Sequence, residues 1–305
     1  MKHLFIVNPT AGGKDSTADV TAQADALLKN SGDEYEIYVT KGVMDAPGKI
    51  KAEAAKTDHM RVYACGGDGT FNECVCGAAE LANVAVCPYP TGTGNDFCRM
   101  FGEEKDMFRD LAALINGTEH VIDLIDCNGR WCANICSVGI DARIGVDVHK
   151  YSSLPVIGGS AGYIVSTVVN VLKSINTKMH VVADGYDVDA EHALVCACNG
   201  RFYGGGFNPS LKARPDDGVM DVYIIKKVSL LTLARLIGKY AAGLADEFPK
   251  YITHLTPEKV EISSVKPTVI QADGEGMVSD RICFRLVKGA AKLIVPKGMR
   301  FFEQP

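Results

Sequence analysis

Hydrophobic and polar positions follow two alternating rhythms over the first third of the chain. Short apolar runs, and one segment in which apolar and polar residues alternate, predict strands at Lys2–Val7, Glu34–Thr40, Arg61–Cys65 and Val84–Cys87. Segments with apolar residues on one helical face lie between or after them, at Ser16–Asn30, Ala46–Lys56 and Phe71–Leu81. Repeated strand–helix–strand units of this kind predict a parallel sheet with helices on both faces.

The pattern changes after about residue 119. The segments Val121–Cys127 and Trp131–Val138 flank Asn128-Gly129, which predicts a hairpin with a type I′ turn. Further strands are predicted at Met179–Ala183, Asp187–Ala197, Val219–Ile225, Lys259–Ser263, Thr268–Ala272, Ile282–Val287 and Lys292–Val295, and helices near Ala161–Ile175 and Leu230–Ala242. We therefore expect an α/β protein of two lobes: a nucleotide-binding lobe of residues 1–119 with the tail from about 295 to 305, and a β-rich lobe of residues 120–294.

Composition and charge narrow the class of protein. The chain has 305 residues, of which 47% are hydrophobic and 23% charged, as in ordinary globular proteins. Its formal net charge of −5 argues against nucleic acid as a partner, because binding phosphate backbones needs a surplus of Lys and Arg. No apolar run approaches the roughly 20 residues of a transmembrane segment. The 11 scattered cysteines predict reduced, core-packed thiols in a cytoplasmic protein.

Three loops rich in small residues follow predicted strands. They are Asn8–Lys14, Gly66–Thr70 and Thr91–Asp96. Glycine lets backbone N–H groups approach phosphate oxygens, and the carboxyl ends of parallel strands meet at one edge of a sheet, so the loops predict a nucleotide cradle. Their spacing fits neither a P-loop nor a dinucleotide fingerprint. Taken alone, Gly66–Thr70 could also be a glycine-rich turn with a capping residue.

The three loops together resemble the catalytic domain of the diacylglycerol kinase family, in its bacterial soluble branch, which is related to sphingosine, ceramide and NAD kinases. The resemblance continues in the second lobe through Gly204–Pro209, Asp216-Asp217-Gly218 and Asp273-Gly274-Glu275, and so covers nearly the whole chain. Departures are small: Gly94 stands where Thr or Ala is commoner, and Cys98 where Ala is. The resemblance implies an NAD-kinase-like first lobe and a sandwich-like second lobe.

The resemblance also assigns roles to individual residues. It implies contacts to the nucleotide phosphates from Asn8, Thr10 and Lys14, and a phosphate loop of Gly66, Gly67, Asp68, Gly69 and Thr70, with Asp68 near the catalytic magnesium. It places Thr91, Thr93 and Asn95 along the nucleotide site, and Asp96, Arg99 and Asp123 in a charged, water-linked network that holds magnesium. It implies that Asp273 is the general base, supported by Glu275, and that Asp217 binds a second, structural magnesium with the carbonyls of Arg214 and Val219.

The activity implied is transfer of the γ-phosphate of ATP, with Mg²⁺, to a lipid hydroxyl at a membrane surface. Diacylglycerol is the expected acceptor and phosphatidic acid the product. The alternatives are an NAD kinase, a kinase of a sphingoid base or another lipid, and an inactive regulator; a homodimer and peripheral membrane contact are left open. The apolar segments Tyr151–Gly159 and Arg201–Phe207 could border a lipid slot or be packed loops.

The pair Asp273 and Glu275 has two readings from the residues themselves. An extended backbone would place the two carboxylates, two positions apart, on one face. Locally, Asp273-Gly274 reads better as a hairpin turn between strands, and a turn is compatible with catalysis.

Overall fold

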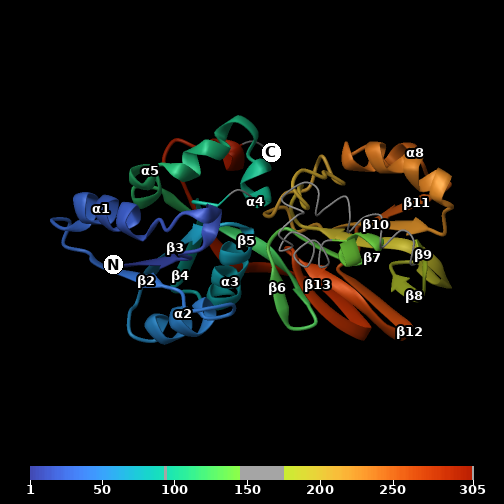
Figure 1. Ribbon diagram of the computed structural model, residues 1–305, viewed down its shortest axis with the longest axis horizontal. Coiled ribbons are helices and arrows are strands. Elements are labelled where there is room, and N and C mark those ends of the chain that lie inside the picture. Colours follow the sequence, from blue (N-terminus) through green and yellow to red (C-terminus); the bar gives the residue numbers. More distant parts are fainter. Residues whose placement is uncertain (93–94, 145–174, 304–305) are drawn as a thin grey trace. The chain divides into compact units, whose positions relative to one another are not determined.

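The computed structural model describes residues 1–92, 95–144 and 175–303. The chain forms two units, Met1–Leu124 with Lys288–Pro305, called here the α/β unit, and Ile125–Val287, called the β-rich unit. It passes between them inside β5 (Thr118–Cys127) and β13 (Glu275–Val295), whereas the sequence placed the lobe boundaries near residues 119 and 294. The two-lobe α/β fold class is confirmed (Figure 1).

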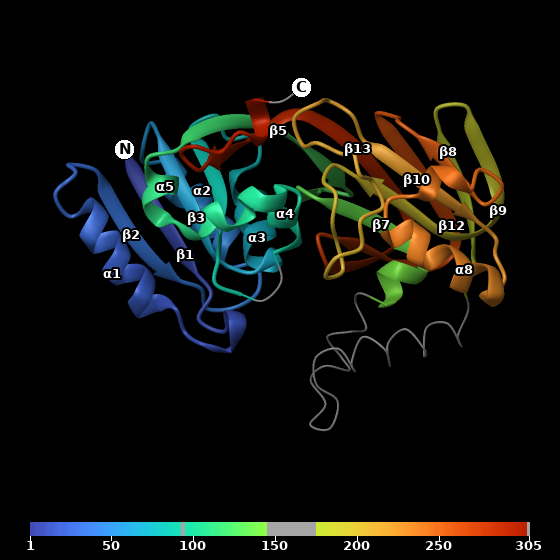
Figure 2. The ribbon, with the colours of Figure 1, turned by 90° about the horizontal axis from the view of Figure 1, so that it is seen from above.

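The α/β unit is built on a parallel sheet with the order β4-β3-β1-β2. Its strands are β1 (Lys2–Val7), β2 (Glu34–Val39), β3 (Met60–Gly66) and β4 (Val84–Pro90). The end of β13 joins β4 in parallel at Leu293 and Val86. Figure 2 shows β2, β1 and β3 side by side. Every residue of β1, β3 and β4 is buried, which explains their continuous apolar runs. Strand β2 lies at the edge of the sheet and is exposed or partly exposed at every position, so its sequence can carry polar residues between apolar ones.

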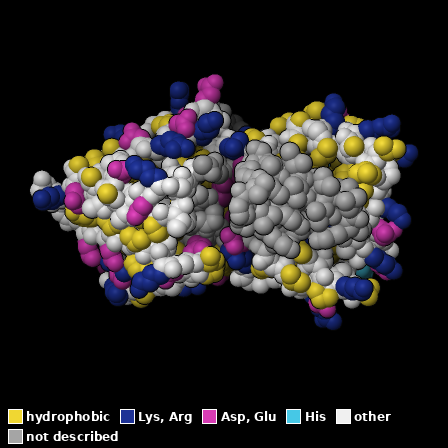
Figure 3. All heavy atoms as spheres, in the orientation of Figure 1, with side chains coloured by type: hydrophobic (Ala, Val, Ile, Leu, Met, Phe, Trp, Pro, Cys, Tyr) yellow, Lys and Arg dark blue, Asp and Glu magenta, His cyan; other side chains and the backbone are white. Residues whose placement is uncertain are grey.

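Helices cover both faces of this sheet, as the alternating pattern predicts. They are α1 (Thr17–Leu28), α2 (Ala46–Ala54), α3 (Asp68–Ala78), α4 (Asp96–Arg99) and α5 (Leu111–Ile115), with 3₁₀ turns η1 (Ala11–Gly13), η2 (Gly102–Arg109) and η4 (Phe301–Glu303). Helix α2 packs against α3, and α1 against α5 (Figure 1). Acidic and basic side chains are interspersed on the face of this unit seen in Figure 3.

Helix α3 begins earlier than the sequence pattern indicates. We expected it to start at Phe71, but it starts at Asp68, and the Phe71 N–H donates to the Gly67 carbonyl at 3.1 Å. The pattern missed this turn because glycine and aspartate have low helix propensity. An aspartate in the first turn is nevertheless favourable, since its charge complements the positive end of the helix dipole. The expected phosphate loop is therefore largely the first turn of a helix.

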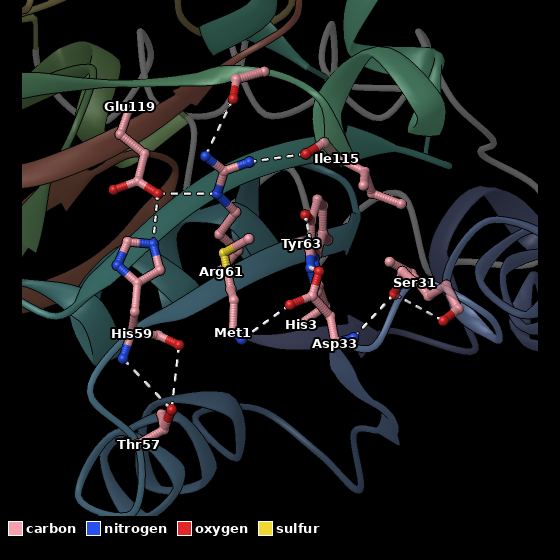
Figure 4. A network of polar contacts seen from close by, with 12 residues as sticks. Met1, His3, Ser31, Asp33, Thr57, His59, Arg61, Tyr63, Ile115 and Glu119 are labelled. Carbon is pink, nitrogen blue, oxygen red and sulfur yellow. Dashed lines mark hydrogen bonds and ion pairs between the residues drawn. The ribbon is translucent and has the colours of Figure 1, made fainter.

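Buried polar contacts fasten the sheet to the segments around it (Figure 4). The Arg61 guanidinium on β3 donates to Glu119 through Nε at 2.9 Å, to the Ile115 carbonyl at 2.9 Å and to the Gly117 carbonyl at 3.1 Å. One buried cation thus binds backbone carbonyls at and after the end of α5 and the Glu119 carboxylate at the start of β5. On β1, the imidazole of His3 is fully buried and its Nδ1 lies 2.8 Å from the Tyr63 hydroxyl.

The β-rich unit is mostly antiparallel. Its elements are β6 (Arg130–Cys132), β7 (Ile135–Gly139), β8 (Thr177–Ala183), β9 (Tyr186–Cys198), β10 (Asp221–Lys226), α8 (Leu230–Ala241), η3 (Ala245–Glu247), β11 (Ile252–Leu255) and β12 (Lys259–Ala272), with parts of β5 and β13. The predicted hairpin is confirmed, since Asn128 and Gly129 have φ values of 51° and 86° as a type I′ turn requires. Strands predicted separately merge into β12, whose register shifts between Ser263 and Thr268, and into β13.

Two cores lie on opposite faces of the same strands in this unit. Along β9, Val195 and Ala197 belong to the core shared with β12 and β13, while Cys196 and Cys198 belong to a second core beneath α8. The period of two is that of a strand buried on both faces. This explains why the run from Ala193 is apolar at every position. The β-rich unit therefore has a layer of strands covered on one side by strands and on the other by α8.

The cysteines behave as the sequence predicts. All 11 are free and 10 of them are buried, and burial raises the pKa of the thiols of Cys65 and Cys98. In the described ranges, no helix is long and apolar enough to cross a membrane. The predicted helix near Ala161–Ile175 lies, up to residue 174, outside the described residues, and so does the apolar segment Tyr151–Gly159.

The burial of His3 predicts a pH dependence of stability. Burial lowers the pKa of His3 from 6.5 to about 4, so the folded chain binds fewer protons than the unfolded chain between these pH values. The contribution of His3 to the free energy of unfolding is complete above pH 6.5 and is lost as the pH falls toward 4. We expect a loss of about 3 kcal/mol in unfolding free energy from this residue, at about 1.4 kcal/mol per pKa unit.

Urea denaturation from pH 7.5 to 4 of the wild type and of His3→Gln measures this effect. The free-energy difference between the two proteins should shrink as the pH falls, because only the wild type carries the buried imidazole. A difference that stays constant over the whole range would contradict this account of His3.

Candidate functional site

The three small-residue loops of the α/β unit meet at the carboxyl edge of its sheet. The N–H groups of Thr91 and Gly92, after β4, both donate to the Gly66 carbonyl at the end of β3, at 3.1 and 3.2 Å. From the loop after β1, Asn8 Nδ2 donates to Thr70 Oγ1 at 3.2 Å. The topology thus brings together residues that are more than 80 positions apart in the sequence (Asn8 and Gly92).

Glycine is required where these loops touch. Gly12 has φ 66°, and a Cβ there would lie 2.6 Å from the Thr91 carbonyl oxygen. A Cβ on Gly66 would lie 2.2 Å from Thr70 Oγ1. A side chain at either position would force backbone or a packed threonine to move, so these glycines keep the loops closed on one another.

The cradle presents donors suited to an anion. Gly67, the N-cap residue of α3, has no side chain, and no side-chain cap forms among the described residues, so the first N–H groups of this 11-residue helix can meet an outside acceptor. The hydroxyl oxygen of Thr91 is buried and has no hydrogen-bond partner among the described residues. A helix start without a cap and an unsatisfied hydroxyl in a glycine-lined edge fit the phosphates of a nucleotide.

Asp68 has structural contacts that the sequence did not reveal. Its carboxylate accepts hydrogen bonds from the Asn95 N–H at 2.6 Å and the Phe97 N–H at 3.4 Å. It therefore fixes the start of α4, where Asn95 adopts a left-handed conformation with φ 97°. Its role near magnesium stays a prediction, and two backbone N–H groups already donate to this carboxylate.

The other predicted residues of the α/β unit occupy distinct positions. Asp96 is buried and pairs with Arg99 across one turn of α4, with Oδ1 and Nε 3.0 Å apart. Asp123 accepts a hydrogen bond from the Gly289 N–H at 2.8 Å. Asn8 Oδ1 accepts from both the N–H and the hydroxyl of Thr10, at 3.0 and 2.9 Å, which shapes the loop after β1.

Two of the predicted nucleotide residues are less defined. Lys14 has an 80% exposed side chain and pairs with Asp19 at 2.9 Å, so its ammonium group lies in water in this structure. Thr93 lies outside the described residues. The contacts of both with a nucleotide stay predictions.

In the β-rich unit, the Asp273 carboxylate organises the backbone around it. It accepts hydrogen bonds from the N–H groups of Ala133, Asn134 and Ile135 at 2.8, 3.0 and 3.0 Å, and Cys132 Sγ lies 2.9 Å away. These donors explain why the strand predicted at Trp131–Val138 breaks into β6 and β7.

The extended-backbone argument for Asp273 and Glu275 is wrong. Asp273 and Gly274 have φ values of 50° and 90° and form the turn between β12 and β13, where Ala272 pairs with Glu275. A left-handed turn does not alternate side chains as a strand does, so spacing alone does not place the two carboxylates together. Glu275 instead lies 3.9 Å from the Arg130 guanidinium. The catalytic roles of both residues stay predictions.

The predicted structural metal site is a turn. The Asp217 carboxylate accepts a hydrogen bond from the Val219 N–H at 2.9 Å, and the Arg214 side chain is bound by Asp216 at 3.0 Å. Within the described residues, no three His, Cys, Asp or Glu side chains cluster as a metal site. Magnesium can bind through one carboxylate, carbonyls and waters, so the set of Asp217 and the carbonyls of Arg214 and Val219 fits this ion chemically.

The sequence did not single out Asp141, which follows β7. Burial raises its pKa to about 6, although the Tyr203 hydroxyl at 3.0 Å and the Ala142 N–H donate to it. A carboxyl group with this pKa can exchange a proton near neutral pH. A lone aspartate after an apolar run is a weak signal in the sequence. Tyr203 and Phe207 pack against the core beneath α8, so these two rings of Arg201–Phe207 belong to a packed loop.

Comparisons with known proteins agree with this architecture. A family model described as "Diacylglycerol kinase catalytic domain" matches residues 2–127, and one described as "YegS C-terminal NAD kinase beta sandwich-like domain" matches residues 134–295. The chain belongs to the diacylglycerol kinase catalytic-domain family, in the branch that carries this second domain. The family resemblance and the prediction of a kinase are confirmed.

Relatives and solved structures span nearly the same length. "Probable lipid kinase YegS-like" of Stenotrophomonas maltophilia is 25% identical over 303 residues, covering 96% of each chain. "Diacylglycerol kinase" of Bacillus subtilis is 28% identical over 276 residues, covering 89% of this chain and 88% of the relative. A crystal structure of a diacylglycerol kinase from Bacillus anthracis superposes with a TM-score of 0.70 at 22% identity, over 98% of both chains, which shows the shared fold.

The closed glycine cradle yields a prediction. Gly12→Ala should lower the affinity for ATP about tenfold or more, because the new Cβ would lie 2.6 Å from the Thr91 carbonyl oxygen and open the loops. Gly42→Ala is the matched control, since a Cβ there meets nothing within 4 Å. Titration with a fluorescent ATP analogue measures both. If the folded Gly12→Ala protein and the control bound ATP with equal affinity, the nucleotide would not bind at this edge of the sheet.

Proposed function

We propose that the chain is an ATP- and magnesium-dependent lipid kinase that transfers the γ-phosphate of ATP to a lipid hydroxyl. The observation that carries the proposal is the glycine-lined cradle, in which the loops after β1, β3 and β4 meet at the uncapped start of α3. Diacylglycerol is the proposed acceptor and phosphatidic acid the product. The name of the Bacillus subtilis relative supports this acceptor, since that protein matches 89% of the chain.

In this proposal the α/β unit binds and orients the triphosphate. The N–H groups at the start of α3 and the Thr91 hydroxyl donate to phosphate oxygens, and Lys14 can turn from Asp19 to add positive charge. Magnesium, when bound with ATP, offsets the negative charge of the phosphoryl group during transfer. Asp68, Asp96 and Asp123 would hold this ion, since magnesium takes oxygen ligands and keeps several of its waters.

The β-rich unit supplies the proton acceptor in this proposal. As the lipid oxygen forms its bond to phosphorus and the bond to the ADP oxygen breaks, the hydroxyl proton passes to the Asp273 carboxylate. The donors from Ala133, Asn134 and Ile135 hold this group in one orientation. Glu275 supports it, and magnesium at Asp217 would stabilise the turn that ends at Val219.

The rival enzyme is an NAD kinase, because the domain that matches residues 134–295 is described as like the beta sandwich of NAD kinases. Its acceptor is a dinucleotide, whose phosphates and ribose need polar contacts. A non-catalytic regulator is the other rival. It is disfavoured because the carboxylates that a transferase needs are all present. They are Asp68, Asp96, Asp123, Asp217, Asp273 and Glu275.

Asp273→Asn should lower turnover about 10²–10⁴-fold, the usual effect of losing a general base. It should leave ATP affinity nearly unchanged. It should also lower the unfolding free energy by about 1–3 kcal/mol, because the new amide N–H₂ would face a backbone N–H that now donates to the carboxylate. Single-turnover kinetics and urea denaturation measure the two effects separately.

Asp280→Asn, at an exposed position on β13, is the control for loss of one charge. A folded Asp273→Asn enzyme with full turnover would show that Asp273 is not the general base. Weaker ATP binding with unchanged turnover of the bound substrate would assign it to the nucleotide site.

The acceptor separates the two enzyme hypotheses. The pure protein, incubated with labelled ATP, magnesium and a total lipid extract, should transfer label to a lipid, and diacylglycerol in detergent micelles should be phosphorylated. NAD at a matched concentration should not be. Formation of NADP with no labelled lipid from any extract would defeat this proposal and favour the NAD kinase. Label in a sphingoid base alone would keep the lipid kinase and change the acceptor.

A further inference from the structure

Strands β7 and β12 carry a buried polar pair between apolar residues. Ser137 on β7 lies opposite Gln271 on β12, and the two residues are 0% and 3% exposed. Cys136 and Val138, on either side of Ser137, belong to the core shared with β12 and β13, so Ser137 points to the opposite side of its strand. A buried polar pair costs stability unless each group is hydrogen-bonded, and an apolar pair of the same shape would serve packing as well. The pair therefore calls for a role beyond packing.

The Gln271 amide connects Ser137 to the turn that holds Asp273. Its Oε1 accepts a hydrogen bond from the Gly274 N–H at 2.8 Å, and its Nε2 donates to Ser137 Oγ at 3.1 Å. The hydrogen bond that closes a four-residue turn joins the first and fourth residues, so the N–H of the third residue, here Gly274, needs another acceptor. Gln271 supplies that acceptor from the strand that enters the turn.

The turn needs this support because Asp273 is held at a φ of 50°. A residue other than glycine keeps a left-handed backbone only when the contacts around it fix the conformation. The Asp273 N–H donates to the Ile135 carbonyl at 3.1 Å, and its carboxylate accepts from the N–H groups of Ala133 and Asn134. These contacts hold Asp273 itself, and Gln271 holds the residue that follows it.

The Asp141 carboxylate fixes the direction of the hydrogen bonds in this chain of contacts. Burial raises the pKa of Asp141 to about 6, although hydrogen bonds, one of them from Ser137, lower it, so above that pH the group is ionised and can only accept. The Ser137 hydroxyl therefore donates its one proton to Asp141, and its oxygen is left to accept from the Gln271 amide. The amide oxygen then faces Gly274. A reversed amide would place its N–H₂ group against the Gly274 N–H, which is also a donor.

We propose that Gln271 is a positioning residue for the Asp273 turn, oriented by Ser137 and Asp141, and that it keeps the general base in place while the lipid hydroxyl reacts. The inference rests on the proposed function, in which Asp273 accepts the hydroxyl proton. Gln271 is buried and acts through the backbone of Gly274. A displacement of about 1 Å in a reacting group can lower the rate roughly 10²-fold, so loss of this contact should affect turnover rather than nucleotide affinity.

Gln271→Met keeps the length of the side chain and removes both of its hydrogen bonds. In single-turnover assays on the full chain, with saturating ATP and diacylglycerol in micelles, the rate should fall about tenfold or more while ATP affinity stays that of the wild type. Ser137→Ala should cause a smaller loss, because Gly274 keeps an acceptor whose orientation is no longer fixed. Thr268→Val, which removes a buried hydroxyl earlier on β12, is the matched control and should turn over like the wild type.

A double-mutant cycle with Asp273→Asn separates positioning from a general loss of structure. Because Gln271 acts through Asp273, Gln271→Met should lower turnover hardly at all once the base is gone, whereas independent defects would multiply. Circular dichroism and urea denaturation check that each variant is folded under the assay conditions, and Ser137→Ala takes the place of Gln271→Met if that protein does not fold. Multiplying losses, or wild-type turnover in a folded Gln271→Met protein, would overturn the inference.

Amide hydrogen exchange tests the contact without the kinase reaction. In protein that carries isotope-labelled glycine, the Gly274 N–H should exchange about tenfold or more faster in Gln271→Met than in the wild type, because its acceptor is gone. Gly129, whose N–H donates to Asp126 at 2.7 Å in another turn, is the internal reference and should not change. An unchanged Gly274 rate would overturn the contact. If the wild type phosphorylated no lipid, the proposed function would fail by itself, and the Gly274 rate would still decide whether Gln271 holds the turn.

Discussion

The close approach of three glycine-containing loops at the carboxyl edge of the parallel sheet is the constraint on which the candidate site depends. Gly12 lies against Thr91, Gly92 against Gly67, and the Gly66 carbonyl accepts two hydrogen bonds from the loop after β4. This contact closes the loops onto the start of α3 and leaves its N–H groups for a ligand. Asp68 then ties α4 to the same edge, so the chemistry of the site and the packing of the loops rest on the same residues.

Much of the fold could be predicted from the sequence, because its rhythm of apolar positions is set by burial. The strands β1, β3 and β4 are buried on both faces and read as unbroken apolar runs. The type I′ turn at Asn128-Gly129 was predictable, because these residue types accept positive φ. The start of α3 was not, because the residues in its first turn have low helix propensity, and tertiary contacts of Asp68 outweigh that preference.

The candidate site was predictable in its motifs but not in its contacts. The turn at Asp273-Gly274 was predictable from its residue types, but the hydrogen bonds over about 140 positions of sequence that hold the Asp273 carboxylate were not. Asp141 gave no motif, because its raised pKa comes from burial that only the fold creates. In each case the missing information is which distant residues cover a side chain.

A crystal structure of the protein with magnesium and a non-hydrolysable ATP analogue tests the central claim most directly. The account predicts that the phosphates lie at the start of α3, in contact with the N–H groups of Gly69 and Thr70 and with the Thr91 hydroxyl, and that the loops after β1 and β4 enclose them. A nucleotide bound away from this edge, with the start of α3 open to solvent, would contradict the account.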